Sequence, residues 1–161
     1  MKISTNTSFA PAMSTLAEAI PLIRNAGFDC FDLSLFGMAH DDDEFNGPDC
    51  IAKAKELRKI ADACGISCNQ SHAPYPTSHS SDTPEHILAN EKIPDRLHRS
   101  LEIAAIVGAK TIVVHPNQHL HWNTHREELA EQNRVFYASL LPYCREYGIR
   151  VAVENMWQYN R

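Results

Sequence analysis

An apolar run with one acid near its end lies close to the C-terminus: Ile149-Arg150-Val151-Ala152-Val153-Glu154-Asn155. Val151 and Val153 alternate with small or polar residues, which is the period of a β-strand with one apolar and one polar face. This pattern is typical of a parallel strand whose outside is covered by helices and whose inner face lines a crowded barrel. Because barrel active sites form at the C-terminal ends of the strands, Glu154 is a candidate catalytic residue.

Upstream of this run, predicted strands and helices alternate in a regular order. Four further strands are expected, at residues 2–6, 28–35, 67–72 and 111–115. The four helices between the strands all end at a glycine that the next strand follows within three residues, namely Gly27, Gly65, Gly108 and Gly148. Ser14 is the expected N-cap of the first helix. The order has no break in composition and predicts one domain over residues 1–161 with a parallel sheet.

Two α/β architectures fit this order, a doubly wound sheet and a barrel. The central strands of a doubly wound sheet are buried on both faces and continuously apolar. Here polar residues recur on one face of three strands: Cys30, Asp32 and Ser34; Cys68, Gln70 and His72; Arg150, Ala152 and Glu154. No Gly-x-Gly-x-x-Gly or phosphate-loop motif follows the first strand. The pattern favours an incomplete barrel of the TIM type, with about four βα units, a fifth strand and helices outside.

Composition and charge indicate which partners and which cellular location to expect. The chain has 15 Lys and Arg against 20 Asp and Glu, a formal net charge of −5, so a nucleic-acid partner is not expected. Its five cysteines are odd in number and form no Cys-x-x-Cys pair, which indicates reduced thiols. The first residues become polar too quickly for a signal peptide, and no apolar run approaches ~20 residues. We therefore expect a cytoplasmic protein that does not enter the membrane.

Aligning the strands by their ends places five polar side chains at one rim: Asn6, Ser34, His72, His115 and Glu154. His115 and Glu154 belong to adjacent strands, roughly 5 Å apart, so both can reach one divalent ion. A carboxylate and an imidazole suit Mn, Co, Fe, Zn or Mg, with the imidazole disfavouring Mg. Asn6 and Asp32 are either substrate-binding residues or structural hydrogen-bonding partners. Trp157 falls in a loop above the rim, where it either stacks on a sugar ring or packs in an interface or in the core.

Three strand-end motifs resemble the xylose isomerase-like TIM barrels: Ser71-His72-Ala73-Pro74, Val113-Val114-His115-Pro116 and Val153-Glu154-Asn155-Met156. Phe31-Asp32-Leu33 is similar to the motif on the second strand of that family, with Asp32 in place of the usual Glu. The family includes sugar epimerases, sugar-phosphate isomerases, hydroxypyruvate isomerase, inosose dehydratase and endonuclease IV. The resemblance runs over the whole chain, which corresponds to about five-eighths of an eight-stranded barrel.

The resemblance implies a metal-dependent isomerase or epimerase of a small sugar or sugar phosphate. In the sugar epimerases the strand-five glutamate, matched by Glu154, binds the metal and moves a proton beside the carbonyl, opposite a glutamate on strand eight. The histidines matched by His72 and His115 touch substrate in single-metal members and bind metal in the endonuclease branch. The implied substrate-binding set is Asn6, Asp32, His72, His115 and Trp157, and the implied metal is Mn, Co, Zn or Mg, held by Glu154 and His115.

The chain departs from the family in length. The family's Asp, His and Glu ligands on strands six, seven and eight have no counterpart, and one strong ligand with one helper does not hold a catalytic ion. We expect either that the chain is a fragment of a longer protein or that two copies pair as a homodimer over the open barrel face. By itself it should be a poor enzyme. The competing functions are phosphodiester cleavage of the endonuclease IV type and a non-catalytic half-barrel that self-assembles.

Overall fold

The computed structural model describes residues 1–9, 15–75, 91–116 and 126–154. In these ranges five strands form one sheet whose strand order is the chain order, with every neighbouring pair parallel. The strands are β1 (Ser4–Asn6), β2 (Cys30–Ser34), β3 (Ser67–His72), β4 (Thr111–Val114) and β5 (Arg150–Val153). The predicted order of strands and their parallel pairing are confirmed, with strand ends shifted by up to two residues.

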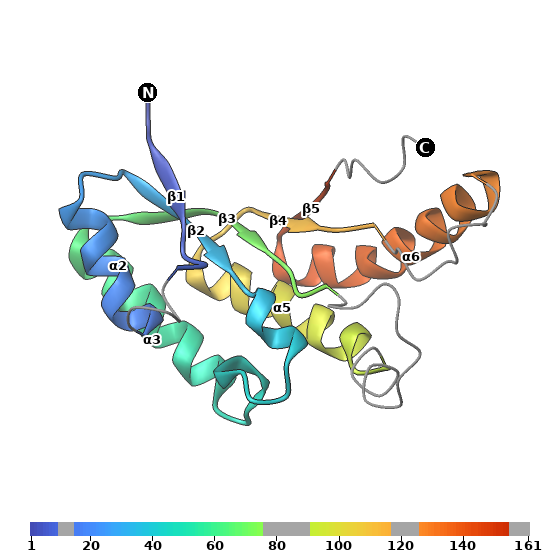
Figure 1. Ribbon diagram of the computed structural model, residues 1–161, viewed down its shortest axis with the longest axis horizontal. Coiled ribbons are helices and arrows are strands. Elements are labelled where there is room, and N and C mark those ends of the chain that lie inside the picture. The colour runs from blue at the N-terminus through green and yellow to red at the C-terminus, as the bar shows by residue number, and fades with distance from the viewer. Residues whose placement is uncertain (10–14, 76–90, 117–125, 155–161) are drawn as a thin grey trace.

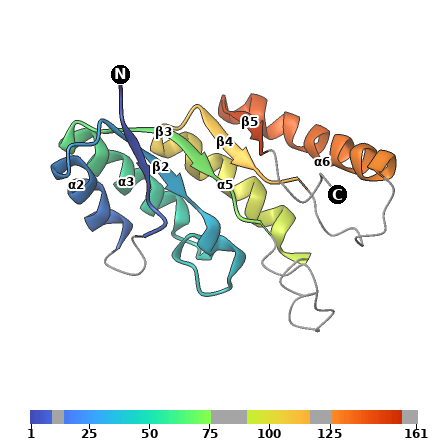
Figure 2. The same ribbon diagram turned by 45° about the horizontal axis from the view of Figure 1, so that its top comes forward.

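Within the described ranges four α-helices connect the strands, and Figure 1 shows these helices on one side of the sheet. They are α2 (Leu16–Asn25), α3 (Cys50–Cys64), α5 (Ile93–Val107) and α6 (Arg126–Tyr147). Two short 3₁₀ helices, η1 (Phe36–Ala39) and η2 (Glu44–Asn46), lie between β2 and α3. No helix of the described ranges covers the opposite face of the sheet, which Figure 2 shows turned toward the viewer. This arrangement confirms an incomplete, unclosed barrel and rules out the doubly wound alternative, which needs helices on both faces.

Local sequence accounts for where the helices begin and end. Thr15 caps α2: its side chain accepts from the Glu18 N–H, and the Glu18 carboxylate accepts from the Thr15 N–H. Ser14, the expected cap, lies outside the described residues. At the C-terminal end of α3, Gly65 has φ +63°. This is a left-handed conformation that residues with a side chain adopt only at a cost in free energy. The capping glycine therefore turns the chain directly into β3.

The core lies between the sheet and its helices. Phe31, Leu33 and Ile112 point toward the helices from the strands and are fully buried. Ile20 and Leu101 meet them from α2 and α5, also without exposed surface. Burying one such side chain contributes about 1.5–3 kcal/mol relative to leaving it in water. The apolar positions of the strands are thus used on the helix side, which leaves the other face for polar side chains.

A register irregularity shapes β2 and β3. The pairing shifts between Phe31 and Asp32, so that Phe31 lies opposite Cys68 whereas Asp32 lies opposite Gln70. From that point the two strands run in register to His72. The bulge brings Asp32, Gln70 and His72 to one face of the sheet, as their mutual contacts described below require.

Two further findings concern the cysteines and the helices. All five cysteines are free thiols in the structure. In the described ranges the helices are too short or too polar to span a lipid bilayer.

Candidate active site at the strand ends

The C-terminal ends of the parallel strands meet at one edge of the sheet, and they carry the predicted site residues. Asn6, Asp32 and His72 lie at or near the ends of β1, β2 and β3, while His115 and Glu154 directly follow β4 and β5. Parallel pairing places these ends side by side, because neighbouring strands are ~4.8 Å apart. The edge therefore offers two carboxylates and two imidazoles for chemistry.

His115 and Glu154 form one close pair at this edge. His115 Nε2 lies 2.8 Å from Glu154 Oε2, and the Glu154 backbone N–H donates to the Val114 carbonyl at 3.4 Å. The imidazole is largely buried, with 12% of the side chain exposed, whereas 40% of the Glu154 side chain is open to solvent. A separation of 2.8 Å suits a hydrogen-bonded ion pair, and it also suits two neighbouring ligands of one ion.

A second pair joins β2 to β3. His72 Nδ1 lies 3.0 Å from the Asp32 carboxylate, and the Gln70 side-chain amide donates to Asp32 Oδ2 at 2.6 Å. The hydrogen bond to Asp32 raises the pKa of His72 above its ordinary value, and the negative charges of Asp32 and Glu154 act in the same direction against the opposing effect of burial. Both carboxylates therefore stabilise the protonated form of His72 relative to its neutral form.

Aromatic rings pack around both histidines. The Tyr75 ring stacks on the His115 imidazole, with centroids 4.3 Å apart and 14° between the planes. Phe36, at the start of η1, turns toward three rings, with centroid distances of 5.4 Å to His72, 5.1 Å to Tyr75 and 6.1 Å to His115. The rings restrict the rotation of both imidazoles and shield them from water.

The remaining predicted residues are placed differently. The Asn6 carboxamide oxygen accepts from the Ser8 N–H at 2.6 Å, which is a local turn at the end of β1. The Ser34 backbone N–H donates to the hydroxyl of the buried Thr7 at 2.9 Å, which ties β1 to β2 just below the edge. Trp157 lies outside the described residues.

Sequence reasoning missed three residues of this edge: Phe36, Gln70 and Tyr75. Gln70 had a signal, because it shares the face of His72 at a spacing of two. Tyr75 follows the Ser71-His72-Ala73-Pro74 motif directly, but a loop residue has no periodicity from which its contacts could be inferred. Phe36 occupies a short 3₁₀ helix that the alternation of strands and helices does not predict.

The described residues include two side chains of the kinds that bind metal ions. Glu154 and His115 provide an oxygen and a nitrogen donor of the kind that transition metals bind. Among the residues that the structure describes, no group of three or more His, Cys, Asp or Glu side chains comes together as a metal site. The pair thus fits two positions of a coordination shell, and further donors would have to come from outside the described ranges.

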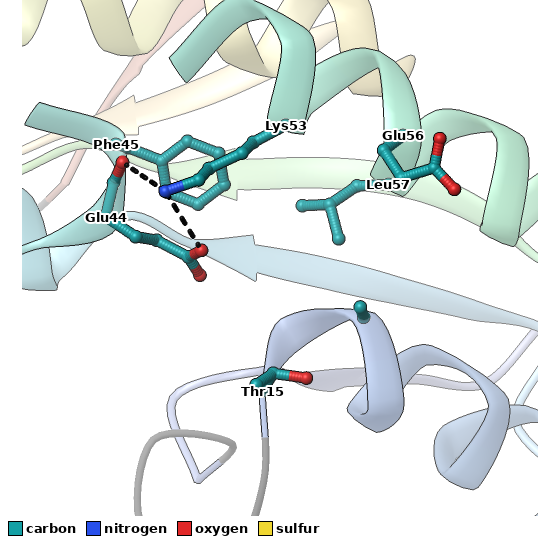
Figure 3. A pocket seen from close by; sticks show the side chains of 7 residues that line it. Thr15, Glu44, Phe45, Lys53, Glu56 and Leu57 are labelled. Atoms are coloured by element: carbon teal, nitrogen blue, oxygen red, sulfur yellow. Dashed lines mark hydrogen bonds and ion pairs between the residues drawn. The ribbon is translucent and has the colours of Figure 1, made fainter. Parts of the chain in front are cut away.

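A separate hollow of about 90 Å³ lies between the start of α2 and the segment formed by η2 and α3 (Figure 3). Lys53 reaches across one side of it to Glu44, 3.2 Å from the backbone carbonyl and 3.7 Å from the carboxylate. The remaining lining residues are Thr15, Ala17, Phe45, Glu56 and Leu57. Neither histidine of the strand-end site lines this hollow, so we assign the candidate active site to the strand ends.

Comparison with known proteins places this geometry in a family. The sequence profile described as "Xylose isomerase-like TIM barrel" matches residues 20–161. The crystal structure of D-psicose 3-epimerase in the presence of D-fructose is similar with a TM-score of 0.68 at 16% identity, covering 100% of this chain and 54% of that one. No curated protein sequence matches the chain significantly.

Two other solved structures extend the comparison. The IOLI protein with a binding zinc atom has a TM-score of 0.62 at 16% identity, covering 95% of this chain and 51% of that one. Endonuclease IV from Thermus thermophilus has a TM-score of 0.58 at 22% identity, covering 97% of this chain and 52% of that one. At these identities the likeness concerns the fold. The chain spans about half the length of the solved structures it matches.

Proposed function

The chain belongs to the xylose isomerase-like TIM barrel family, and on that basis we propose that the complete protein is a metal-dependent isomerase or epimerase of a small sugar or sugar phosphate. The observation that carries the proposal is the pair of Glu154 and His115, 2.8 Å apart at the ends of adjacent parallel strands on the open face of the sheet. Similarity to D-psicose 3-epimerase supports the choice of a sugar substrate.

Glu154 is the proposed catalytic base. One carboxylate oxygen contacts His115, and a carboxylate has a second oxygen that can accept a proton. Glu154 takes the proton from the carbon beside the sugar carbonyl; the C–H electron pair becomes the C=C bond of an enediolate, and the carbonyl π pair moves to oxygen. A proton delivered to the opposite face by a second acid gives the epimer, and Glu154 is left protonated on its own face. Transfer of the proton from Glu154 to the neighbouring carbon gives the isomer instead. The second acid of the epimerase route is proposed to come from outside the described residues.

A divalent ion, Mn, Co, Zn or Mg, is the proposed cofactor of the complete protein. Glu154 and His115 would hold it, together with donors from outside the described ranges. When bound, such an ion polarises the carbonyl oxygen and stabilises the negative charge that develops there. The zinc atom bound in the similar IOLI structure supports metal use by this kind of barrel.

We propose His72 and His115 as substrate contacts, since both stand at the edge beside Glu154. Asn6 is the proposed contact at the end of β1, where its amide nitrogen remains a donor while its oxygen serves the turn with Ser8. Trp157 stays a prediction. The proposed cellular location is the cytoplasm. We also propose that residues 1–161 form a single domain, which is the N-terminal part of the barrel.

The test is proton exchange with solvent. The complete protein is incubated in deuterated water with a panel of ketoses, aldoses and their phosphates, with each of the four metals in turn, and the carbon beside the carbonyl is followed by NMR. We expect deuterium to enter one substrate class, and Glu154→Gln to abolish its entry with the fold unchanged by circular dichroism. Exchange that persists in Glu154→Gln would reject Glu154 as the base.

A phosphodiesterase of the endonuclease IV type is the second candidate, favoured by the structural similarity to the Thermus thermophilus enzyme. The net charge of −5 argues against it, because phosphate backbones are bound through Lys and Arg. Incision of a duplex that contains one abasic site distinguishes the two functions. A non-catalytic half-barrel that self-assembles and a homodimer over the open face both predict that the 161-residue chain associates with itself. Size-exclusion chromatography of this chain tests both ideas. A well-folded monomer would contradict them.

A further inference from the structure

The buried contact between β2 and β3 suggests how the site controls a proton on a substrate oxygen. We infer that Asp32 is a positioning residue that holds His72 in the Nδ1–H tautomer, leaving His72 Nε2 to take a proton from a hydroxyl oxygen of the sugar and return it. This inference rests on the proposed function and adds to it a second proton carrier, which works on oxygen while Glu154 works on carbon.

The Asp32 carboxylate is buried, and its contacts are with two side chains of β3. The residue is only 6% exposed, and its carboxylate accepts from the Gln70 amide while facing His72 Nδ1. An ionised carboxylate can only accept hydrogen bonds, so the nitrogen that faces it must carry the hydrogen. In neutral His72 the hydrogen is therefore on Nδ1, and Nε2, on the far side of the ring, has a lone pair.

The ring has little freedom to leave this orientation. Gln70, which lies opposite Asp32 on β3, donates a hydrogen bond to the Asp32 carboxylate. The shift of register after Phe31 creates this pairing. Phe36 packs its ring against the imidazole with 69° between the planes. The His72 side chain is 18% exposed, enough for one edge of the ring to meet a ligand.

The charges around His72 suit a group that gains and loses a proton. When Nε2 takes the hydroxyl proton, the O–H bonding pair stays on oxygen, and the imidazolium that forms is stabilised by the adjacent Asp32 carboxylate. Among the described residues the charged groups that influence His72 are Asp32 from β2 and Glu154 after β5, both negative. Returning the proton to the same or the neighbouring oxygen restores the neutral ring, so the cycle balances.

The experiment replaces Asp32 by Asn in the complete protein and follows the nitrogen resonances of His72 by NMR of histidine-labelled protein. In the parent protein we expect the Nδ1–H tautomer at high pH. In Asp32→Asn we expect a mixed or reversed tautomer, a His72 pKa closer to its ordinary value, and turnover reduced about 10- to 100-fold with a shifted pH profile. Asp32→Glu should restore the tautomer and part of the turnover.

The matched control is Asp29→Asn. Asp29 precedes the opposite end of β2 and accepts from the Ile3 N–H at 2.8 Å, so its removal perturbs the same strand without touching His72. It should leave the tautomer and the pH profile unchanged. An unaltered His72 tautomer in Asp32→Asn, or an altered tautomer with full turnover, would overturn the inference. A parent protein that exchanges no proton with any sugar would reject the proposed function, and the tautomer would still decide whether Asp32 positions His72.

Discussion

Tyr75 lies flat on His115, with ring centroids 4.3 Å apart and planes inclined by 14°. A loop residue after β3 thus orients the imidazole that pairs with Glu154 after β5, so three consecutive strands contribute to one contact. The His115 imidazole is held by a ring on its face and a carboxylate at its edge. Each of these contacts leads to a separate measurement.

Replacing Tyr75 by Leu removes the aromatic face but keeps an apolar side chain. Aromatic pairs contribute about 0.5–1.5 kcal/mol beyond their buried area, so we expect Tyr75→Leu to lower the free energy of unfolding by about that amount. Tyr75→Phe keeps the ring and should stay within about 0.5 kcal/mol of the parent. Urea unfolding followed by circular dichroism measures both, and equal losses in the two variants would show that stacking contributes nothing.

Replacing His115 by Ala tests the proposed metal position. Loss of one nitrogen donor should weaken the binding of Mn²⁺ or Co²⁺ to the complete protein by about tenfold or more, measured by calorimetry after chelator treatment. His98→Ala is the control, because His98 stacks on Tyr143 between α5 and α6, away from the strand ends. An unchanged dissociation constant for the metal in His115→Ala would reject His115 as a metal ligand. Its role would then be the contact with Glu154.

The His72–Asp32 pair makes stability depend on pH. The pKa of His72 is raised from an ordinary 6.5 by its hydrogen bond to Asp32, so the folded chain keeps a proton that the unfolded chain releases. The stabilisation is complete below the ordinary pKa of 6.5 and is lost as pH rises through the folded-state pKa. Urea unfolding across this window should show stability that falls with pH, less steeply in Asp32→Asn. Curves of equal slope in the parent and the variant would contradict the coupling.

Substitutions at Gly65 measure how much the free energy of unfolding depends on the left-handed conformation at the end of α3. Its φ is +63°, and an added Cβ would meet nothing within 4 Å, so Gly65→Ala should lose stability through backbone strain alone, by about 1 kcal/mol. Gly65→Asn should lose less, because Asn tolerates this conformation better. Thermal unfolding of the two variants provides the comparison. A larger loss for Asn than for Ala would point to a cause other than φ.

The sequence was sufficient to predict the order of the strands, because period-two apolar residues and helix-ending glycines are local signals. It also predicted that His72, His115 and Glu154 stand at one edge, since parallel strands end together. It did not reveal that Asp32 holds His72, because the shift of register between Phe31 and Asp32 depends on how two distant strands fit. Phe36 and Tyr75 escaped for a related reason: loop conformations follow tertiary contacts rather than periodicity.

The agreement between spatial order and chain order has a consequence for biosynthesis. Every strand from β2 onward hydrogen-bonds to the strand translated just before it. As the polypeptide leaves the ribosome, the partner of each new strand from β2 to β5 has already emerged, so these five strands can pair in the order of their synthesis.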